Sequence, residues 1–510
     1  MFKRLLSVGG FTLLSRITGF ARDVLMAAVL GAGPMSDAFL VAFRLPNNFR
    51  AIFGEGAFNA AFLPRFAAAR TRGGDDHAHE FADRIFAWQM AFQIFLLVAA
   101  LAAMPWVIRA MAPGFAGHPG QVELATKLAR IAFPYLIFTL VAVQLSAMLN
   151  AIGKFAAAAA WSIFLNVAMV GTLLCSGLFA NAAFAAAWGV FLAGILQLLF
   201  IVYASARAGL HLHLHWPRWT PDAREFLWAL GAATLGSASI QISLFIDNLI
   251  ASFLPPGDLT ALYYADRINQ LPMGTLGIAL GTVLLPEMSN RLAKGDAAGA
   301  STEQNRAAAL ALFFTLPFVA AYFAVPGAIM RGLFAHGAFH LEAADLSAAA
   351  LMAYGVGLPA FVLVRIVAPT FYARGDTATP VRATIASVVV NIALKFALVW
   401  GFHFGAVGIA LGTALAAWVN VGVLVYLARA RDLLSFDRLF TRSLLPILIA
   451  AAATGAGAWA GAHAAVSLFH AGRWQDEIML ALAVVCGGVA YGAVTLVFRR
   501  TLPFGRLGRA

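Results

Sequence analysis

The stretch that decides the fold is SRITGFARDVLMAAVLGAGPMSDAFLVAFRLPNNFRAIFGEG, residues 15–56. It reads as two membrane-spanning helices joined by a short turn marked by glycine and proline. A charged side chain at the centre of a spanning helix costs about 2.5–3.5 kcal/mol. Seven facing lipid would cost on the order of 20 kcal/mol, so we expect them to line a wet cavity or to pair inside the protein. The seven are Arg16, Arg22, Asp23, Asp37, Arg44, Arg50 and Glu55.

The whole chain has the composition of a polytopic membrane protein. Its 510 residues are 62% hydrophobic and 11% charged, with a mean hydropathy of +0.83. Apolar stretches of about 20 residues, enough to cross the hydrocarbon core, recur along its length. We predict an all-α protein with fourteen transmembrane helices and no sizeable soluble domain. The spans lie near residues 5–31, 35–63, 84–112, 122–150, 157–179, 183–206, 225–254, 260–289, 306–334, 344–372, 380–401, 404–428, 442–469 and 476–498.

The distribution of basic residues sets the predicted topology. With a cytoplasmic N-terminus, 23 of the 35 lysines and arginines fall in inside segments, and the outside turns hold only Arg109, Arg331 and Arg473. The positive-inside rule therefore predicts that both termini are cytoplasmic. The net charge of +12 thus reflects membrane topology, and we expect no nucleic-acid partner. The N-terminal apolar run lacks a small-residue cleavage site, so we expect it to stay as the first helix.

An internal repeat with an offset of about 223 residues extends over the first twelve spans. Six spans per repeat is an even number, so the two halves are related by an axis along the membrane normal. We predict an N-terminal six-helix lobe at 1–208, a C-terminal six-helix lobe at 222–431, and two additional helices at 438–500. The aligned pairs include Asp23 with Asp247, Arg44 with Arg267, Pro134 with Pro359, and Asn166 with Asn391.

Two bundles related in this way enclose a central cleft, and alternating access arises when one rocks against the other. This places the first two spans against spans seven and eight, which contribute Asp247, Asp266 and Arg267. Arg16 and Asp23 are seven residues apart, which is two helical turns, so they project to one side of their helix. Charges are therefore expected to form stripes along the cleft.

The intramembrane charges favour an anionic ligand. Nine bases stand against five acids, and the planar guanidinium of arginine suits phosphate oxygens, which makes pyrophosphate the natural ligand. Any one arginine beside an aspartate is equally explained as a structural strut. The chain lacks a phosphate-cradling loop, a zinc-binding helix motif and a nucleophile elbow, so we expect a transporter rather than an enzyme, with no cofactor.

Three smaller features carry separate predictions. Lys395 on span eleven is a candidate partner of Asp247, in an ion pair that couples conformation to charge; the alternative is a lysine that snorkels to an interface. The HLHLH sequence at His211–His215 is read as a polar loop near the headgroups, with no metal site expected. The GxxxG spacing at Gly277–Gly281 and at Gly457–Gly461 predicts close helix packing.

Several motifs in order resemble the MurJ/MviN family of lipid II flippases, in the multidrug/oligosaccharidyl-lipid/polysaccharide exporter superfamily. They are SRITGFARD, SDAFLVAFRLPN, FGEGAF, YYADR and LGIALGTVLLP. The resemblance covers nearly the whole chain. It implies a fourteen-helix protein of the bacterial inner membrane that moves undecaprenyl-pyrophosphate disaccharide-pentapeptide, lipid II, from the cytoplasmic to the periplasmic leaflet for peptidoglycan synthesis and cell shape. Lipid II, membrane lipids and cell-wall synthesis proteins are the implied partners.

The resemblance also implies roles for particular residues. The substrate-binding candidates are Arg16, Arg22, Arg50 and Arg267, supported by Asp37, Ser15, Asp23, Asn47 and Glu55. Spans thirteen and fourteen are implied to form a groove for the lipid tail. Gln270 and Lys395 stand where some relatives have acids, which puts sodium coupling in doubt and favours the membrane potential as the driving force.

Three other functions remain to be separated from this one. A flippase for another polyprenyl-linked glycan would share the same charge logic. A multidrug exporter would need net acid in its cavity to attract organic cations, and the excess of bases counts against it. A scaffold of a cell-wall complex would leave the repeated arginines unexplained.

Overall fold

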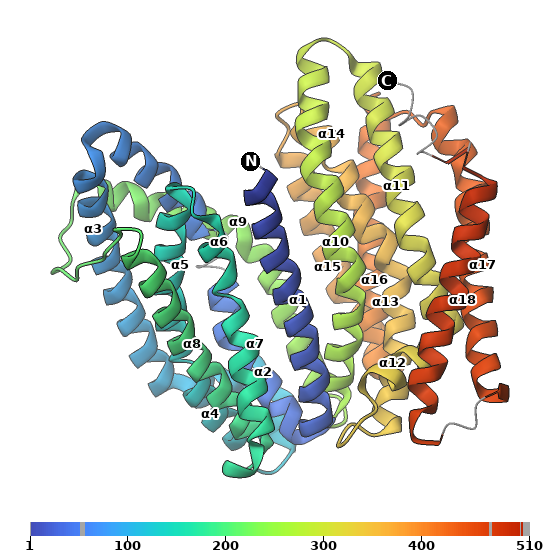
Figure 1. Ribbon diagram of the computed structural model, residues 1–510, viewed down its shortest axis with the longest axis horizontal. Coiled ribbons are helices and arrows are strands. Elements are labelled where there is room, and N and C mark those ends of the chain that lie inside the picture. The colour runs from blue at the N-terminus through green and yellow to red at the C-terminus, as the bar shows by residue number, and fades with distance from the viewer. Residues whose placement is uncertain (1, 52–56, 469–471, 500, 503–510) are drawn as a thin grey trace. The chain divides into compact units, whose positions relative to one another are not determined.

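The structure is a computed structural model that describes residues 2–51, 57–468, 472–499 and 501–502. Helices joined by short turns make up these ranges, and no strand occurs in them, which confirms the predicted all-α class (Figure 1). The chain divides into two compact units, Met1–Gly257 and Asp258–Ala510. Each unit is described by itself below.

The first unit contains the helices α1 to α9. Its packed pairs include α1 with α7, α2 with α4, α3 with α9, and α5 with α8. The segments α4 and α5 are the two parts of one span that breaks near Pro134, and α6 and α7 form another. The bounds are α1 Phe2–Leu30, α2 Pro34–Phe49, α3 Phe58–Met111, α4 Gln121–Ala132, α5 Tyr135–Ala151, α6 Phe155–Ala160, α7 Ile163–Leu174, α8 Ala182–Ala206 and α9 Pro221–Ala251.

The second unit contains the helices α10 to α18. Here α13 packs on α10, α11 and α16, while α17 packs on α11 and α18. The bounds are α10 Asp258–Ala293, α11 Ala297–Ala324, α12 Pro326–Phe334, α13 Leu341–Val367, α14 Pro369–Tyr372, α15 Ala378–Phe396, α16 Gly405–Ala430, α17 Arg438–Leu468 and α18 Gln475–Val497.

Membrane-spanning length and hydropathy agree with the predicted spans. Within the described ranges, ten helical segments are long and apolar enough to cross a bilayer, and they coincide with predicted spans three to six and nine to fourteen. The other four predicted spans fall on α1, α2 with the start of α3, α9 and α10, which are the charged helices. The protein is therefore a multi-pass membrane protein, and its helices are consistent with the predicted fourteen.

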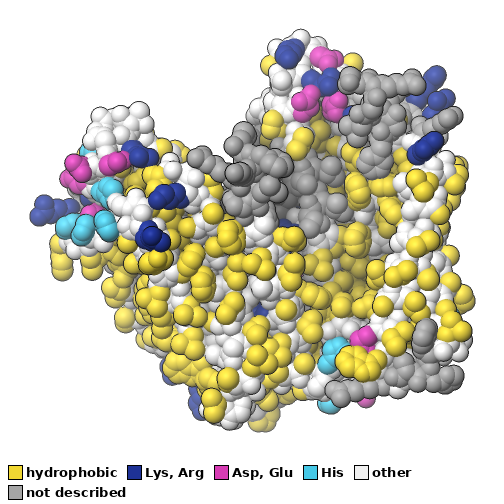
Figure 2. Space-filling view, viewed as in Figure 1, with side chains coloured by type: hydrophobic (Ala, Val, Ile, Leu, Met, Phe, Trp, Pro, Cys, Tyr) yellow, Lys and Arg dark blue, Asp and Glu magenta, His cyan; other side chains and the backbone are white. Residues whose placement is uncertain are grey.

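Charged side chains gather at the ends of the helices. In Figure 2, apolar side chains cover the middle of each unit; His, Asp, Glu, Lys and Arg gather over the α3 turn, and Asp, Glu, Lys and Arg gather over the α10–α11 turn. This is the surface expected of a protein whose middle faces lipid.

The segment between the second and third spans is more helical than the sequence suggested. Helix α3 continues through the polar residues 64–83 and reverses direction at Gly74, whose φ of 76° and ψ of −168° are open only to glycine. Just inside this turn, the rings of Phe58, Phe62 and Phe66 stack in a row, and Phe58 and Phe62 meet Phe226 of α9 edge to face. This apolar contact holds α9 in the first unit, although the sequence predicted α9 as the first span of the second lobe. The predicted lobe boundaries stay a prediction.

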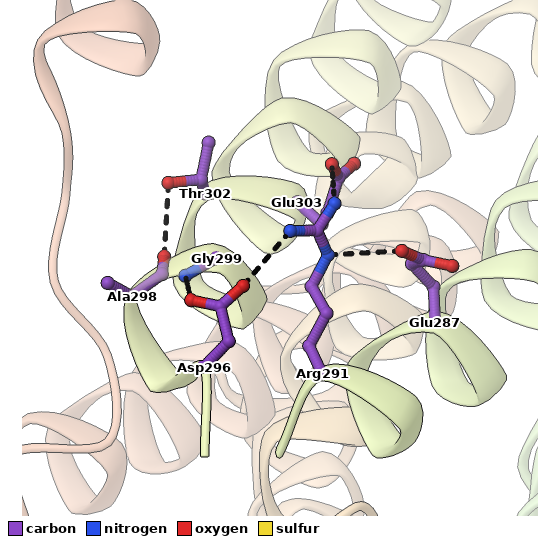
Figure 3. A network of polar contacts seen from close by, with 7 residues as sticks. All are labelled: Glu287, Arg291, Asp296, Ala298, Gly299, Thr302 and Glu303. Carbon is purple, nitrogen blue, oxygen red and sulfur yellow. Dashed lines mark hydrogen bonds and ion pairs between the residues drawn. The ribbon is translucent and has the colours of Figure 1, made fainter. Parts of the chain in front are cut away.

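The α10–α11 turn is held by a cluster of ion pairs around Arg291 (Figure 3). Its guanidinium donates to Glu287 Oε1 at 3.0 Å, to Asp296 Oδ2 at 3.2 Å and to Glu303 Oε1 at 3.0 Å. Asp296 also caps α11 by accepting the Gly299 N–H at 2.7 Å. This backbone hydrogen bond, assisted by Arg291, lowers the pKa of Asp296. The turn is thus fixed by charge on the predicted cytoplasmic side.

Small residues allow the last two helices to approach closely. A Cβ on Gly461 would lie 2.4 Å from the Leu482 carbonyl oxygen, and one on Gly457 would lie 2.7 Å from the Cys486 carbonyl oxygen. The predicted close packing at Gly457–Gly461 is therefore confirmed between α17 and α18.

Candidate functional site

The charged residues of the predicted site begin with a buried network between α1 and α7. Arg22 is 5% exposed and Asp23 is 0% exposed. The Arg22 guanidinium donates to Asp23 Oδ1 through Nε at 3.0 Å and Nη2 at 2.6 Å, and to Asn166 Oδ1 through Nη1 at 3.1 Å. Removal of one partner of such a buried ion pair costs about 3–5 kcal/mol of stability, because the other charge stays buried without compensation.

Asn166 of α7 is the residue that joins this network to the rest of α1. Its amide Nδ2 donates to the Ser15 carbonyl oxygen at 3.0 Å and to Thr18 Oγ1 at 3.1 Å. The hydroxyl of Ser162 donates to Ser15 Oγ at 3.2 Å. The structure therefore brings together three predicted site residues, Ser15, Arg22 and Asp23. It adds two partners from the fifth span, Ser162 and Asn166, that the sequence analysis did not predict as site residues.

Asp37 lies in the first turn of α2, where the helix dipole favours a carboxylate. It is 3% exposed, and its Oδ2 accepts the backbone N–H of Gly257 at 2.6 Å. Gly257 has a φ of 102°, which a side chain would strain. Asp37 thus ties the turn between α1 and α2 to the segment that follows α9, a structural task beside its predicted role in binding.

The two arginines of the second span, Arg44 and Arg50, donate hydrogen bonds to amide side chains. Arg44 Nη1 donates to Oδ1 of the buried Asn248 on α9 at 2.7 Å, so this arginine links α2 to α9. Arg50 lies at the C-terminal end of α2, and its Nη2 donates to Asn47 Oδ1 at 3.0 Å. Both guanidinium groups are half-buried. A neutral amide accepts a hydrogen bond from an arginine without neutralising the charge of the guanidinium group.

The other predicted site residues are placed as follows. Arg16 is half-buried on α1, and Arg267 is half-buried on α10 in the second unit. Next to Arg267, Asp266 Oδ2 accepts from Gln270 Nε2 at 2.5 Å. Glu55 lies outside the described residues.

The candidate coupling pair is divided between the units. Asp247 is half-buried on α9 of the first unit, while Lys395 is 1% exposed on α15 of the second. Lys395 packs on Gly412 of α16, where a Cβ would come 2.8 Å from its side chain. The interior position of Lys395 differs from a snorkelling lysine at an interface. The ion pair itself stays a prediction.

The HLHLH segment lies against α3. Asp83 Oδ1 accepts the backbone N–H of His213 at 2.8 Å, and its Oδ2 faces the rings of His213 at 3.3 Å and His215 at 3.6 Å. Over the described part of the chain, no group of three or more His, Cys, Asp or Glu side chains is arranged to hold a metal ion. The two histidines hold the connection between α8 and α9 in place.

Solved structures of other proteins share the fold of this chain. A chain described as "Lipid II flippase MurJ, inward closed conformation" aligns with a TM-score of 0.78 at 22% identity, over 96% of this chain and 98% of its own. An inward-facing multidrug resistance MATE family transporter of the MOP superfamily aligns with a TM-score of 0.66 at 17% identity, over 84% and 97%. This chain therefore shares the fold of these two solved proteins.

Sequence comparison shows the family to which the chain belongs. The family model described as "Lipid II flippase MurJ" matches residues 26–472. A probable lipid II flippase MurJ of Rhizobium tropici is 40% identical over 461 residues, which is 89% of this chain and 86% of the relative. A lipid II flippase MurJ of Burkholderia cenocepacia is 33% identical over 437 residues, 82% of each chain. The protein belongs to the lipid II flippase MurJ family.

Proposed function

We propose that this protein flips lipid II from the cytoplasmic to the periplasmic leaflet of the bacterial inner membrane. The observation that carries the proposal is the family match over residues 26–472, which includes the arginine-bearing second and eighth spans. Its cargo is undecaprenyl-pyrophosphate disaccharide-pentapeptide, the lipid-linked precursor of peptidoglycan. The protein acts as a transporter without chemistry of its own, and its termini lie in the cytoplasm as the basic loops predict.

The half-buried arginines are the groups that bind the pyrophosphate. Arg16, Arg50 and Arg267 offer planar guanidinium groups that pair with phosphate oxygens in a bidentate manner. Asn47 positions Arg50 through the 3.0 Å hydrogen bond between them. The binding residues come from both repeats, so rocking of one lobe against the other moves the headgroup across the membrane while the prenyl tail stays in lipid along α17 and α18.

Arg22 has a different task in this proposal. Its guanidinium is already engaged by Asp23 and Asn166, so it holds α1 against α7. Arg44, bonded to Asn248, holds α2 against α9 in the same way. Contact of either arginine with lipid II requires these hydrogen bonds to be exchanged for phosphate.

The membrane potential is the proposed driving force. Moving one elementary charge through 100 mV is worth about 2.3 kcal/mol, so an unbalanced charge in the cavity or on the cargo biases the cycle. The buried Lys395 is the candidate for that charge in the second repeat, with Asp247 as its partner. A flippase for another polyprenyl-linked glycan is the alternative, because pyrophosphate recognition alone does not select the sugar.

Reconstitution tests the proposal. Wild-type protein in proteoliposomes should move lipid II to the opposite leaflet, measured with a membrane-impermeant reagent that modifies the pentapeptide. Arg50→Glu should abolish this movement, because it replaces a phosphate ligand by a repelling charge, while Arg382→Glu at an exposed helix start should leave it unchanged. Equal transport of an unrelated polyprenyl-linked glycan, or full activity of Arg50→Glu, would contradict the proposal.

A further inference from the structure

The first unit contains an apolar cavity that the proposed transport cycle does not use. It has a volume of about 980 Å³ and lies between α3, α9 and the connection that precedes α9. Aromatic side chains dominate its walls, among them Trp88, Phe92, Phe95, Trp219 and Trp228. None of the predicted pyrophosphate ligands lines it. Any ligand of this cavity must therefore be inferred separately from the ligand of the proposed cargo site.

The cavity has one polar end and one apolar end. The helices α3, beyond its Gly74 turn, and α9 both run from the predicted cytoplasmic side into the membrane. At the mouth, Trp88 Nε1 donates to the Arg218 carbonyl oxygen at 3.0 Å and meets Trp219 edge to face at 5.2 Å. From Arg224 to Thr234 the wall descends about 15 Å, ten residues of helix at 1.5 Å each. Tryptophan at such a depth is typical of the membrane interface.

Two glutamine side chains in the cavity wall have buried amide groups that find no hydrogen-bond partner in the described part of the chain. Gln89 and Gln93 are one helical turn apart on α3, and Gln93 is 2% exposed. The amide nitrogen and oxygen of both are buried without a hydrogen-bond partner among the residues that the structure describes. Leaving a polar group unsatisfied costs about 1–3 kcal/mol each. The walls thus offer amide groups to a ligand that carries polar atoms within an otherwise apolar body.

The mouth of the cavity is positively charged. The two nearest acids already face arginines, Asp222 at 3.2 Å from Arg84 and Glu225 at 3.7 Å from Arg65. Arg224 lines the cavity and is exposed, with no ion pair to any side chain in the described ranges. It also borders an adjoining hollow of about 700 Å³ at the start of α9. The charge at the mouth therefore favours an anionic headgroup.

We propose that this cavity binds an anionic phospholipid of the cytoplasmic leaflet. One acyl chain lies among the aromatic side chains, the N–H groups of Gln89 and Gln93 donate to the glycerol ester carbonyls, and Arg224 pairs with the phosphate. The ester carbonyl groups distinguish a phospholipid from a polyprenyl phosphate as the ligand. A polyprenyl phosphate would fill the apolar walls and meet Arg224, but it has no ester groups for the two amides. This inference does not depend on the proposed transport of lipid II.

Photo-crosslinking locates the lipid. The full-length protein in detergent is incubated with phosphatidylglycerol that carries a diazirine on one acyl chain, illuminated, digested and analysed by mass spectrometry. Crosslinks should concentrate on peptides that contain residues 88–95 and 227–234. Unlabelled phosphatidylglycerol should compete better than phosphatidylethanolamine by about tenfold, because the ammonium group of phosphatidylethanolamine offsets the phosphate charge that attracts Arg224. Crosslinks spread evenly over the membrane surface would overturn the proposal.

Variants separate cavity binding from general lipid contact. Gly231 lines the cavity and a Cβ there meets nothing within 4 Å, so Gly231→Leu extends a side chain into open space and should reduce crosslinking at least several-fold. Gly171→Leu on α7 is the matched control, since Gly171 is equally open and lies away from the cavity. Arg224→Gln should abolish the preference for phosphatidylglycerol. Unchanged crosslinking in Gly231→Leu would contradict the proposal.

A last competition distinguishes the lipid from cargo. Undecaprenyl phosphate should compete weakly at these peptides, because it lacks ester groups. If it displaces the phosphatidylglycerol probe more strongly than phosphatidylglycerol does, the cavity belongs to the cargo path and the phospholipid assignment is wrong. All of these experiments measure lipid binding, so their results do not depend on any assay of lipid II flipping.

Discussion

Replacement of Asn166 by leucine should loosen α1 from α7 by a predictable amount. The substitution removes hydrogen bonds to the Ser15 carbonyl oxygen, to Thr18 and to the Arg22 guanidinium. Two neutral hydrogen bonds within a membrane contribute about 0.6 kcal/mol each. The charge-assisted one contributes about 1.5 kcal/mol or more. We therefore expect Asn166→Leu to lower the free energy of unfolding by about 3 kcal/mol.

The internal repeat supplies the control. Asn391 of α15 is aligned with Asn166 and has similar burial, at 7% against 5% exposed. Its Oδ1 has no hydrogen-bond partner among the described residues, so Asn391→Leu should cost under about 1 kcal/mol or even stabilise the protein. Unfolding by denaturant in detergent micelles, followed by tryptophan fluorescence, measures both variants. Equal stability of the two, or an Asn166→Leu protein as stable as wild type, would refute the assigned network.

Three further predictions concern other contacts. Asp37→Ala should lower the free energy of unfolding by about 2 kcal/mol, because it removes a charge-assisted hydrogen bond to a backbone N–H; no loss in a denaturant titration would contradict this. Gly357→Ala should cost about 1–3 kcal/mol, since its Cβ would lie 2.6 Å from Ala414 Cα, whereas Gly488→Ala, with open space around it, should be neutral in the same assay. The pKa of Asp376 is lowered to about 2, chiefly by the Thr379 hydroxyl, so its contribution is present above the unfolded pKa of about 3.9 and disappears as the pH falls through about 2. The difference in unfolding temperature between wild type and Asp376→Asn should therefore shrink from pH 5 to pH 2, and a constant difference would contradict the assigned hydrogen bonds.

The sequence predicted the helical class and the positions of the spans because hydropathy and length suffice for both. It also predicted that the charges of α1 and α2 would be paired or accessible rather than exposed to lipid. The polar stretch 64–83 was harder to predict, because its composition suits a loop and only the packing of the α3 turn makes it helical.

The partners of the arginines could not be predicted from spacing alone. Asn166 and Asn248 lie on helices far away in the sequence from Arg22 and Arg44, so the contacts exist only once α1 meets α7 and α2 meets α9. A single asparagine in an apolar span, FLNVAMVG, was the available signal. The same holds for Gln89 and Gln93, whose isolation from partners is visible only when the walls of their cavity are in place.

The central claim is tested most directly by measuring which leaflet holds lipid II in cells depleted of this protein. A membrane-impermeant reagent applied from the periplasmic side should label less lipid II after depletion, while total lipid II rises. Wild-type protein should restore labelling and Arg50→Glu should not. Unchanged labelling of outward lipid II after depletion would contradict the account.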